Sequence, residues 1–296
     1  MKKLRAGDKV AVIAPSGQIG NIEKIQDGLK YLSELGLVPV LGKHTLEQYR
    51  YMAGTDKHRA QDVNDAFKNP EIKAIFCVRA AAGAARILPY IDYDNAKKNK
   101  KPLIGFCDNA ALQIALLQKS GIISWNGFLL SYDFRHKKLD KLIDENLQTL
   151  ISGNKFDITS GTTLRRGKAK GKLICSNLSV LMKLAGTPYF PNLNGKILLI
   201  EDTHERLHKI DLMLQQLKQQ ATFSKLRGLI FGNFTDCTGD AEDGTLQDCF
   251  NDFMQGINIP VLQDFQFGHT DSRYVLPQGG TVLLDADKGK LEVLSY

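Results

Sequence analysis

The chain has 296 residues, of which 43% are hydrophobic and 24% carry charged side chains. This length predicts two compact domains, each with its own core. The ordinary charged fraction excludes disordered, collagen-like and coiled-coil proteins. No run of about eighteen apolar residues occurs, so we expect no membrane-spanning helix. The apolar run at residues 10–14 is too short for a signal-peptide core, and we therefore expect a cytoplasmic protein.

The formal net charge of +7 raises the question of a polyanionic partner. The densest basic runs, at residues 97–101 and 165–172, lie in expected loops and lack the interleaved aromatic side chains that stack on bases. A solvated basic surface is the better interpretation, and we expect no nucleic-acid partner. Five cysteines without CxxC spacing argue against a disulfide framework or a zinc cluster. They are Cys77, Cys107, Cys175, Cys237 and Cys249.

The first half of the chain alternates short apolar runs with stretches of helical spacing. The apolar runs are KVAVIAP, LVPVLG, KAIFCV and PLIGF, and the helical stretches include NIEKIQDGLKYLSELG, HRAQDVNDAFKN and ALQIALLQKSG. Buried strands that alternate with amphipathic helices are typical of parallel βαβ units. The pattern predicts an N-terminal, doubly wound parallel-sheet α/β domain over residues 1–135.

The pattern loosens at residues 136–170, where charged and Gly/Thr-rich sequence predicts a linker with one helix. Beyond it, the helix LSVLMKLAG, the strand KILLIED, the helix HERLHKIDLMLQQLKQQ and the apolar run LRGLIFGNF follow one another. The end, TVLLDADKGKLEVLSY, predicts a hairpin that turns at residues 287–289. Residues 171–296 are therefore expected to form a second α/β domain.

Cys107 lies in GFCDNA, between an apolar run and a helical stretch. A strand, a sharp turn that carries a nucleophile, and a helix together make a nucleophile elbow, in which the next backbone N–H can hold an oxyanion. A helix N-terminus also favours thiolate. The alternative is a small buried cysteine in a tight turn, which is common in proteins.

A nucleophile needs a base, and the base needs an orienting acid. His269 lies in FGHTDSRYVLPQGG, a loop of turn-forming residues, where catalytic groups are often carried. Glu201 directly follows the apolar KILLI, so its carboxylate is expected at a strand end, where it can accept an imidazole N–H. Its alternative role is that of an acid at a helix N-terminus. The other histidines are expected on the solvated surface: His204 and His208, four apart on one helix without a third metal ligand, and His44, His58 and His136, which have basic neighbours.

Six segments, in this order, resemble the LD-carboxypeptidase family, which includes the microcin C self-immunity peptidases. They are VAVIAPSG, the arginine-led loop with ARILPYIDYD, PLIGFCDNAAL, SNLSVLMKLAGTPYFP, GKILLIEDTHERLHKIDLML and FGHTDSRYVLPQGG. The resemblance implies an N-terminal α/β domain, a C-terminal swivelling α/β domain and a homodimer. It also implies a nucleophile, acid and base at Cys107, Glu201 and His269, in the chain order of elbow-bearing hydrolases.

The chain departs from the family pattern in three loops. The family has serine where this chain has Cys107, Arg-Gly-Gly-Tyr-Gly where it has residues 79–83, and Gly-Gly-Asn-Leu where it has residues 175–178. The resemblance implies an oxyanion hole made by the backbone N–H groups of Asp108 and Ala81. An alanine keeps that N–H but disfavours a positive φ. The cysteine is compatible with natural adaptation, with loss of activity, or with an introduced substitution.

The resemblance predicts a hydrolase that cleaves an amide bond near the C-terminus of a small peptide, such as a recycled muropeptide. Arg79 and Asn177 are the expected substrate-binding residues, and Arg79 suits a substrate carboxylate. We expect no metal and no organic cofactor in this chemistry. Two alternatives remain: a catalytically impaired, peptide-binding homologue, and a microcin C-type self-immunity peptidase that acts on another acyl amide.

Overall fold

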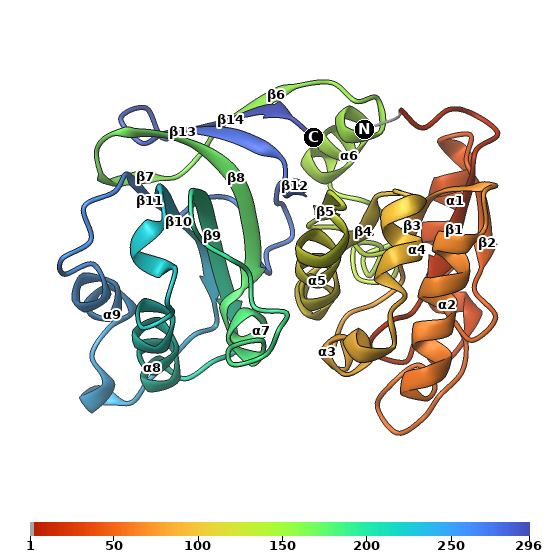
Figure 1. The fold of residues 1–296 in the computed structure, drawn as a ribbon, viewed down its shortest axis with the longest axis horizontal. Coiled ribbons are helices and arrows are strands. Elements are labelled where there is room, and N and C mark those ends of the chain that lie inside the picture. The colour runs from red at the N-terminus through yellow and green to blue at the C-terminus, as the bar shows by residue number, and fades with distance from the viewer. Residues whose placement is uncertain (1–2) are drawn as a thin grey trace. The chain divides into compact units, whose positions relative to one another are not determined.

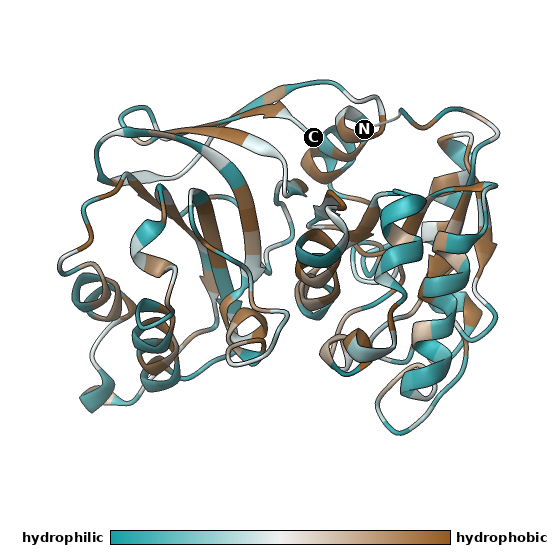
Figure 2. Cartoon of the chain, viewed as in Figure 1, coloured by the Kyte–Doolittle hydropathy of each residue, from teal (hydrophilic) through white to brown (hydrophobic). Residues whose placement is uncertain are grey.

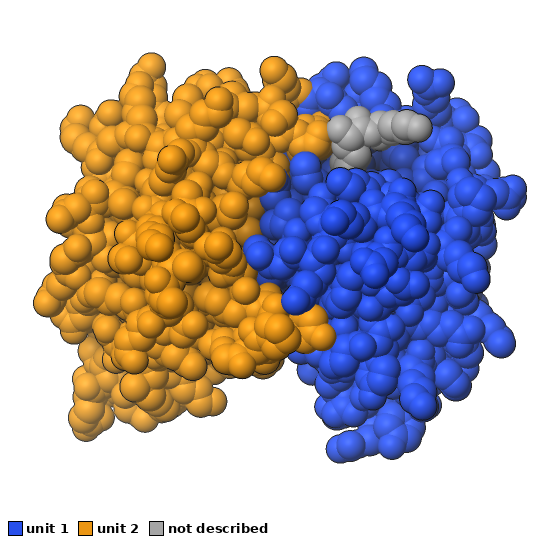
Figure 3. Space-filling view, viewed as in Figure 1, with its two compact units in different colours: residues 1–154, 274–279 blue, residues 155–273, 280–296 orange. Residues whose placement is uncertain are grey.

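The computed structural model describes residues 3–296 and divides into two compact units (Figure 3). The first unit comprises the residues up to Asn154 together with Tyr274–Gly279, and the second comprises Lys155–Arg273 and Gly280–Tyr296. Within the stretch 136–170, the residues up to 154 belong to the first unit and the rest belong to the second.

A six-stranded sheet forms the centre of the first unit within the described residues (Figure 1). Its strands are β1 (Lys9–Ile13), β2 (Val38–Leu41), β3 (Ile72–Cys77), β4 (Leu103–Gly105), β5 (Ser124–Asn126) and β12 (Leu276–Gln278). They lie in the order β12-β5-β4-β3-β1-β2, and all neighbours pair in parallel except β12 with β5. The strand order reverses between β1 and β3, and in open α/β sheets ligands bind beyond the carboxyl ends of the strands at such a point.

The helices of the first unit follow the strands, as expected for βαβ units. They are η1 (Ile22–Ile25), α1 (Gln26–Glu34), α2 (Asp56–Lys68), α3 (Ala84–Ile87), η2 (Leu88–Tyr90), α4 (Tyr93–Lys98), η3 (Cys107–Asn109), α5 (Ala110–Ser120) and α6 (Lys141–Ile151). α4 packs between α2 and α5 (Figure 1). α5 is apolar on nearly every face and is almost wholly buried, so the segment after Cys107 is anchored in the core.

The second unit contains an eight-stranded mixed sheet within the described residues. Its strands are β6 (Phe156–Thr159), β7 (Thr162–Arg165), β8 (Lys168–Asn177), β9 (Lys196–Thr203), β10 (Gly228–Thr235), β11 (Val261–Gln263), β13 (Thr281–Asp285) and β14 (Lys290–Ser295). The order is β6-β14-β13-β8-β9-β10-β11-β7, and the parallel strands are β8 to β11. The predicted C-terminal hairpin is confirmed as β13 and β14.

The helices of the second unit connect its parallel strands. They are α7 (Leu178–Lys183), α8 (Leu207–Lys218), η4 (Phe223–Lys225), η5 (Ala241–Asp243) and α9 (Leu246–Phe253). The parallel strands are brown with apolar residues in Figure 2, and β9 is buried from Ile197 to Asp202. Because Glu201 and Asp202 end this buried run, their carboxylates are carried into the interior at the carboxyl end of β9.

The predicted fold class, two α/β domains of which the first contains a doubly wound parallel sheet, is confirmed. In residues 3–296, no helix has the length and apolar character needed to cross a bilayer.

Candidate active site

Cys107 occupies the sharp turn between β4 and α5 in the first unit. Its φ is +57°, in the left-handed region that a non-glycine residue rarely adopts. Phe106 before it is extended, and η3 begins at Cys107 itself. Gly105 makes the turn possible, because a Cβ there would lie 3.0 Å from the Cβ of Asn109 and 3.2 Å from the Sγ of Cys77. The strand, strained residue and helix are the geometry that presents a nucleophile.

Asp108 is buried and ties three loops together. Its Oδ2 accepts hydrogen bonds from the Ser16 hydroxyl at 2.5 Å and from the Ala84 backbone N–H at 2.8 Å. Ser16 follows β1, Asp108 follows β4, and Ala84 begins α3 after the loop that follows β3. The carboxylate therefore fixes the Cys107 turn against the two loops at the switch point of the sheet. Sequence reasoning assigned only the backbone of Asp108 a role and overlooked Ser16.

The loop at residues 79–83 runs beside this turn. Ala81 has a φ of +97°, so it keeps a backbone conformation that glycine adopts without strain. The loop is held from both sides, because Ala80 accepts a hydrogen bond from the Gly17 N–H at 2.9 Å and the Asn109 side chain donates to the Arg79 carbonyl at 3.2 Å. Arg79 is exposed, and its Nη1 donates to the Gln18 carbonyl at 2.7 Å.

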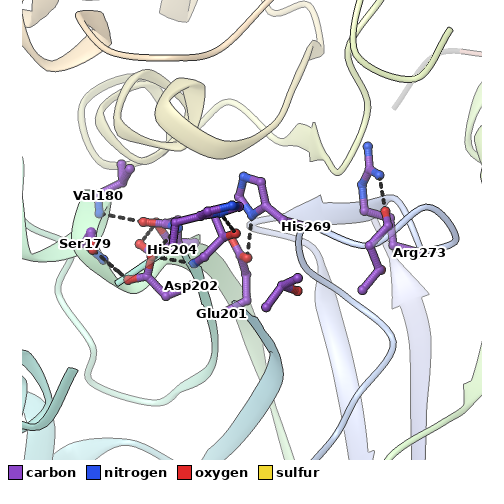
Figure 4. Close-up of polar contacts among 12 residues, drawn as sticks. Ser179, Val180, Glu201, Asp202, His204, His269 and Arg273 are labelled. Atoms are coloured by element: carbon purple, nitrogen blue, oxygen red, sulfur yellow. Dashed lines mark hydrogen bonds and ion pairs between the residues drawn. The ribbon is translucent and has the colours of Figure 1, made fainter. Parts of the chain in front are cut away.

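Glu201 and His269 meet in the second unit (Figure 4). Nδ1 of His269 lies 2.8 Å from Oε2 of Glu201, whose side chain is fully buried, while 13% of the His269 side chain is exposed. The structure therefore brings together two residues that are 68 positions apart in the chain. A buried carboxylate on one ring nitrogen fixes the tautomer and orientation of the imidazole and stabilises its protonated form.

Two glycines allow this close approach. A Cβ at Gly232 would lie 2.3 Å from the Phe267 carbonyl oxygen and 3.1 Å from the Cβ of Glu201. Gly268 has a φ of +147°, and a Cβ there would lie 2.8 Å from the Asn233 carbonyl oxygen. The β9–β10 register shifts between Phe231 and Phe234, opposite Glu201, as bulges beside functional groups often do. Gly232, the glycine in the apolar run LIFGNF, is the sequence signal for this bulge.

Asp202, the next residue along β9, is nearly fully buried and organises the adjacent strand end (Figure 4). It accepts hydrogen bonds from the Asn177 amide at 2.8 Å, the Ser179 hydroxyl at 2.7 Å and the Thr203 N–H at 2.8 Å. The Asn177 oxygen in turn accepts from the Val180 N–H at 3.0 Å and caps α7. Asn177 is the β8 register partner of Glu201, so this network holds the strand end that carries the Glu201 carboxylate.

The electrostatics of Glu201 combine opposing effects. Burial raises the pKa of Glu201 above its ordinary value, whereas the hydrogen bond from His269 lowers it. The neighbouring Asp202 carboxylate also acts to raise the pKa of Glu201. The net result is a Glu201 carboxyl whose pKa lies above its ordinary value although His269 bonds to it.

Two expectations for the other histidines were wrong. His44 is only 6% exposed, because its ring stacks on His58 and its backbone N–H donates to Asp62. His204 does not share a helix with His208, because it has a φ of +57° and precedes α8. The expectation of solvation holds for His204, His208 and His136, which are exposed.

A strained strand-to-helix turn is the geometry that presents a nucleophile, and a buried glutamate bonded to a histidine orients an imidazole as a general base requires. The comparisons with known proteins identify the class. The LD-carboxypeptidase N-terminal domain model matches residues 10–127, and the LD-carboxypeptidase C-terminal domain model matches residues 170–284. The chain belongs to the LD-carboxypeptidase family and is a carboxypeptidase-like hydrolase.

Named relatives agree with this membership. A "probable murein peptide carboxypeptidase" of Bacillus subtilis is 32% identical over 96% of this chain and 91% of the relative. The microcin C7 self-immunity protein MccF of Escherichia coli is 27% identical over 90% of this chain and 86% of the relative. The crystal structure of a muramoyltetrapeptide carboxypeptidase from Oxalobacter formigenes has a TM-score of 0.89 and 25% identity, covering 97% of this chain and 99% of that one.

Proposed function

We propose that this chain is a thiol-dependent LD-carboxypeptidase that removes the terminal residue of a muropeptide, with Cys107 as nucleophile, His269 as base and Glu201 as orienting acid. The observation that carries the proposal is the 2.8 Å contact between buried Glu201 and His269. That contact leaves the imidazole in one orientation, as a general base requires.

The reaction proceeds in two halves. His269 takes the proton of the Cys107 thiol, and the sulfur attacks the carbonyl carbon of the amide. The resulting oxyanion accepts hydrogen bonds from the backbone N–H groups of Asp108 and Ala81. His269 then gives the proton to the amine nitrogen, the C–N bond breaks, and a thioester remains on Cys107. A water deprotonated by His269 attacks the thioester, the C–S bond breaks, and the thiol regains its proton.

Arg79 and Asn177 are the proposed substrate-binding residues. Arg79 is exposed, so its guanidinium suits the terminal carboxylate of a peptide in a bidentate pair. The Asn177 amide is already bonded to Asp202, so a substrate contact by Asn177 would use its backbone or a rearranged side chain. We further propose that the enzyme is cytoplasmic and that it forms a homodimer. Light scattering coupled to gel filtration tests the dimer directly.

The proposed substrate rests on the similarity to a murein peptide carboxypeptidase and a muramoyltetrapeptide carboxypeptidase, and analysis of the reaction products tests it. We incubate the protein with a muropeptide tetrapeptide and, separately, with an aminoacyl sulfamoyl nucleotide, and identify products by mass spectrometry. Loss of the terminal residue from the tetrapeptide supports the proposal. Cleavage of the nucleotide alone favours the second candidate, a self-immunity peptidase, to which the relative MccF points. Saturable binding of the tetrapeptide without cleavage would instead make the chain a peptide-binding homologue.

A further inference from the structure

The loop between β2 and α2, residues 42–55, carries a cluster of side chains that the proposed chemistry does not use. Among residues 3–296, His44, Glu47 and His58 are the group whose potential metal-ligating atoms all lie within 4.8 Å of one another. His44 and Glu47 lie on the loop, and His58 lies in the first turn of α2. The cluster therefore joins the loop to a helix of the first unit.

Both imidazoles point at one carboxylate. Nδ1 of His44 lies 2.7 Å from Oε1 of Glu47, and Nδ1 of His58 lies 2.7 Å from Oε2 of the same residue. The two rings stack with their centroids 4.2 Å apart and an angle of 18° between the planes. Two imidazole nitrogens and a carboxylate oxygen that converge in this way match the His₂Glu ligand set of zinc sites, with a fourth position for water.

The surrounding contacts hold each ligand in place. The His44 N–H donates to the buried Asp62 carboxylate at 3.0 Å, and the His58 N–H donates to the Thr55 hydroxyl that caps α2 at 3.2 Å. Gly54 has a φ of +87°, and a Cβ there would lie 2.7 Å from Oε2 of Glu47, so a larger residue would be strained and would displace this oxygen. The His44 side chain is only 7% exposed and cannot leave the cluster without unpacking the loop. These contacts fix the backbone positions of both histidines.

We propose that His44, Glu47 and His58 bind a divalent transition-metal ion, with Zn²⁺ as the best match. In the metal-free form each imidazole donates its Nδ1 proton to Glu47. When the ion binds, each ring moves its proton from Nδ1 to Nε2 and stays neutral, so that each Nδ1 gives its lone pair to the ion and Glu47 gives one carboxylate oxygen. The charge balance is suitable, because one carboxylate and two neutral imidazoles offset half of the charge of the ion.

The loop that this ion would clamp borders the Cys107 turn within the first unit. The Gln18 N–H donates to the Tyr51 carbonyl at 3.2 Å, and the Ala53 N–H donates to the Ser16 carbonyl at 3.1 Å. Ser16 in turn donates to Asp108. Metal binding is therefore expected to stabilise the first unit and to protect the loop from proteolysis, whether or not the proposed peptidase activity is correct.

The test is a titration of the metal-free protein with Zn²⁺ by calorimetry and with Co²⁺ by absorption spectroscopy. We expect one ion per chain, a tetrahedral Co²⁺ spectrum without the near-ultraviolet charge-transfer band of a thiolate ligand, and a rise in unfolding temperature. Glu47→Gln and His58→Ala should each weaken binding at least ~10-fold, by analogy with the loss of a supporting group alone. His136→Ala, which removes an exposed histidine outside the cluster, is the matched control and should bind normally.

Glu47→Gln keeps the shape of the side chain, so its circular dichroism without metal reports whether the fold is retained. Three results would overturn the proposal: no saturable binding by the unaltered protein, an affinity in Glu47→Gln and His58→Ala equal to that of the unaltered protein, or a Co²⁺ spectrum dominated by thiolate. The last result would assign the ion to a cysteine instead.

Discussion

Nδ1 of His269 lies 2.8 Å from Oε2 of Glu201, a carboxylate that is fully buried and stands at the carboxyl end of β9. The Glu201–His269 pair has opposite consequences for stability and for catalysis. Burial makes the charge on Glu201 costly for folding, while the same charge orients the imidazole and stabilises its protonated form.

Glu201→Gln should lower kcat roughly 10²–10⁴-fold, because glutamine can accept or donate at His269 and no longer selects one tautomer. The KM should change much less, since Glu201 is buried and is not expected to touch the substrate. Steady-state kinetics on the tetrapeptide measure both. An unchanged kcat would remove Glu201 from the mechanism.

The same variant tests how Glu201 affects the pH dependence of stability. The pKa of Glu201 is raised in the folded state, so the unfolded chain ionises first as the pH rises above about 4.5. The folded state then binds more protons than the unfolded state, and the contribution of Glu201 to stability falls as the pH rises toward its folded pKa. The unfolding temperature of Glu201→Gln relative to the unaltered chain should therefore increase as the pH rises above about 4.5. A constant or decreasing difference in calorimetry would contradict this reading.

Asp108→Ala should destabilise the first unit by about 1–3 kcal/mol, because it leaves the buried Ala84 N–H without its acceptor. Ser16→Ala is the matched variant and should cost about 1 kcal/mol, since it removes only a donor and leaves Asp108 bonded to Ala84. Trp125 is the single tryptophan of the chain and is buried in the first unit, so its fluorescence during urea unfolding reports this unit alone. Equal midpoints for all three proteins would show that the Asp108 contacts carry no stability.

Ala81→Gly should stabilise the first unit by up to about 1.5 kcal/mol. A non-glycine residue in left-handed backbone costs about 1–2 kcal/mol, and the greater entropy of an unfolded glycine offsets about 0.5–1 kcal/mol of the gain. The φ of +97° at Ala81 is the source of that strain. The unfolding midpoint followed by Trp125 fluorescence should rise; a lower midpoint would show that the loop relaxes around alanine.

Alkylation by iodoacetamide tests whether Cys107 is activated. Helix η3 begins at Cys107, and His269 is its proposed base, so Cys107 should be alkylated faster than the other thiols at neutral pH. Cys237 is the internal control, because burial raises its pKa to about 11. His269→Ala should slow the alkylation of Cys107 and leave Cys237 unchanged. Peptide mass spectrometry gives both rates. An alkylation rate of Cys107 that is unchanged by His269→Ala would count against a catalytic pair.

Much of the fold could be predicted from the sequence, because buried parallel strands and amphipathic helices leave distinct patterns. Glu201 and His269 could also be predicted, since one ends an apolar strand and the other lies in a loop of turn-forming residues. The pairing of Ser16 with Asp108 could not, because it spans 92 positions and depends on β1 lying inside the sheet next to β3.

His44 was mispredicted for a related reason. Its basic neighbour Lys43 indicates a surface position, but the burial of its side chain depends on the return of the chain at His58, which local sequence does not reveal. The positive φ of Ala81 likewise follows from contacts with neighbouring loops and not from alanine itself, which disfavours that conformation.

The central claim, that Cys107 is the nucleophile of a peptidase, is tested most directly by turnover of the tetrapeptide with three proteins. These are the unaltered chain, Cys107→Ala and Cys107→Ser, each first confirmed as folded by Trp125 fluorescence. We expect release of the terminal residue by the unaltered chain and a loss of roughly 10³-fold or more in Cys107→Ala. Cleavage by Cys107→Ala at the rate of the unaltered chain, or no cleavage by any of the three, would contradict it.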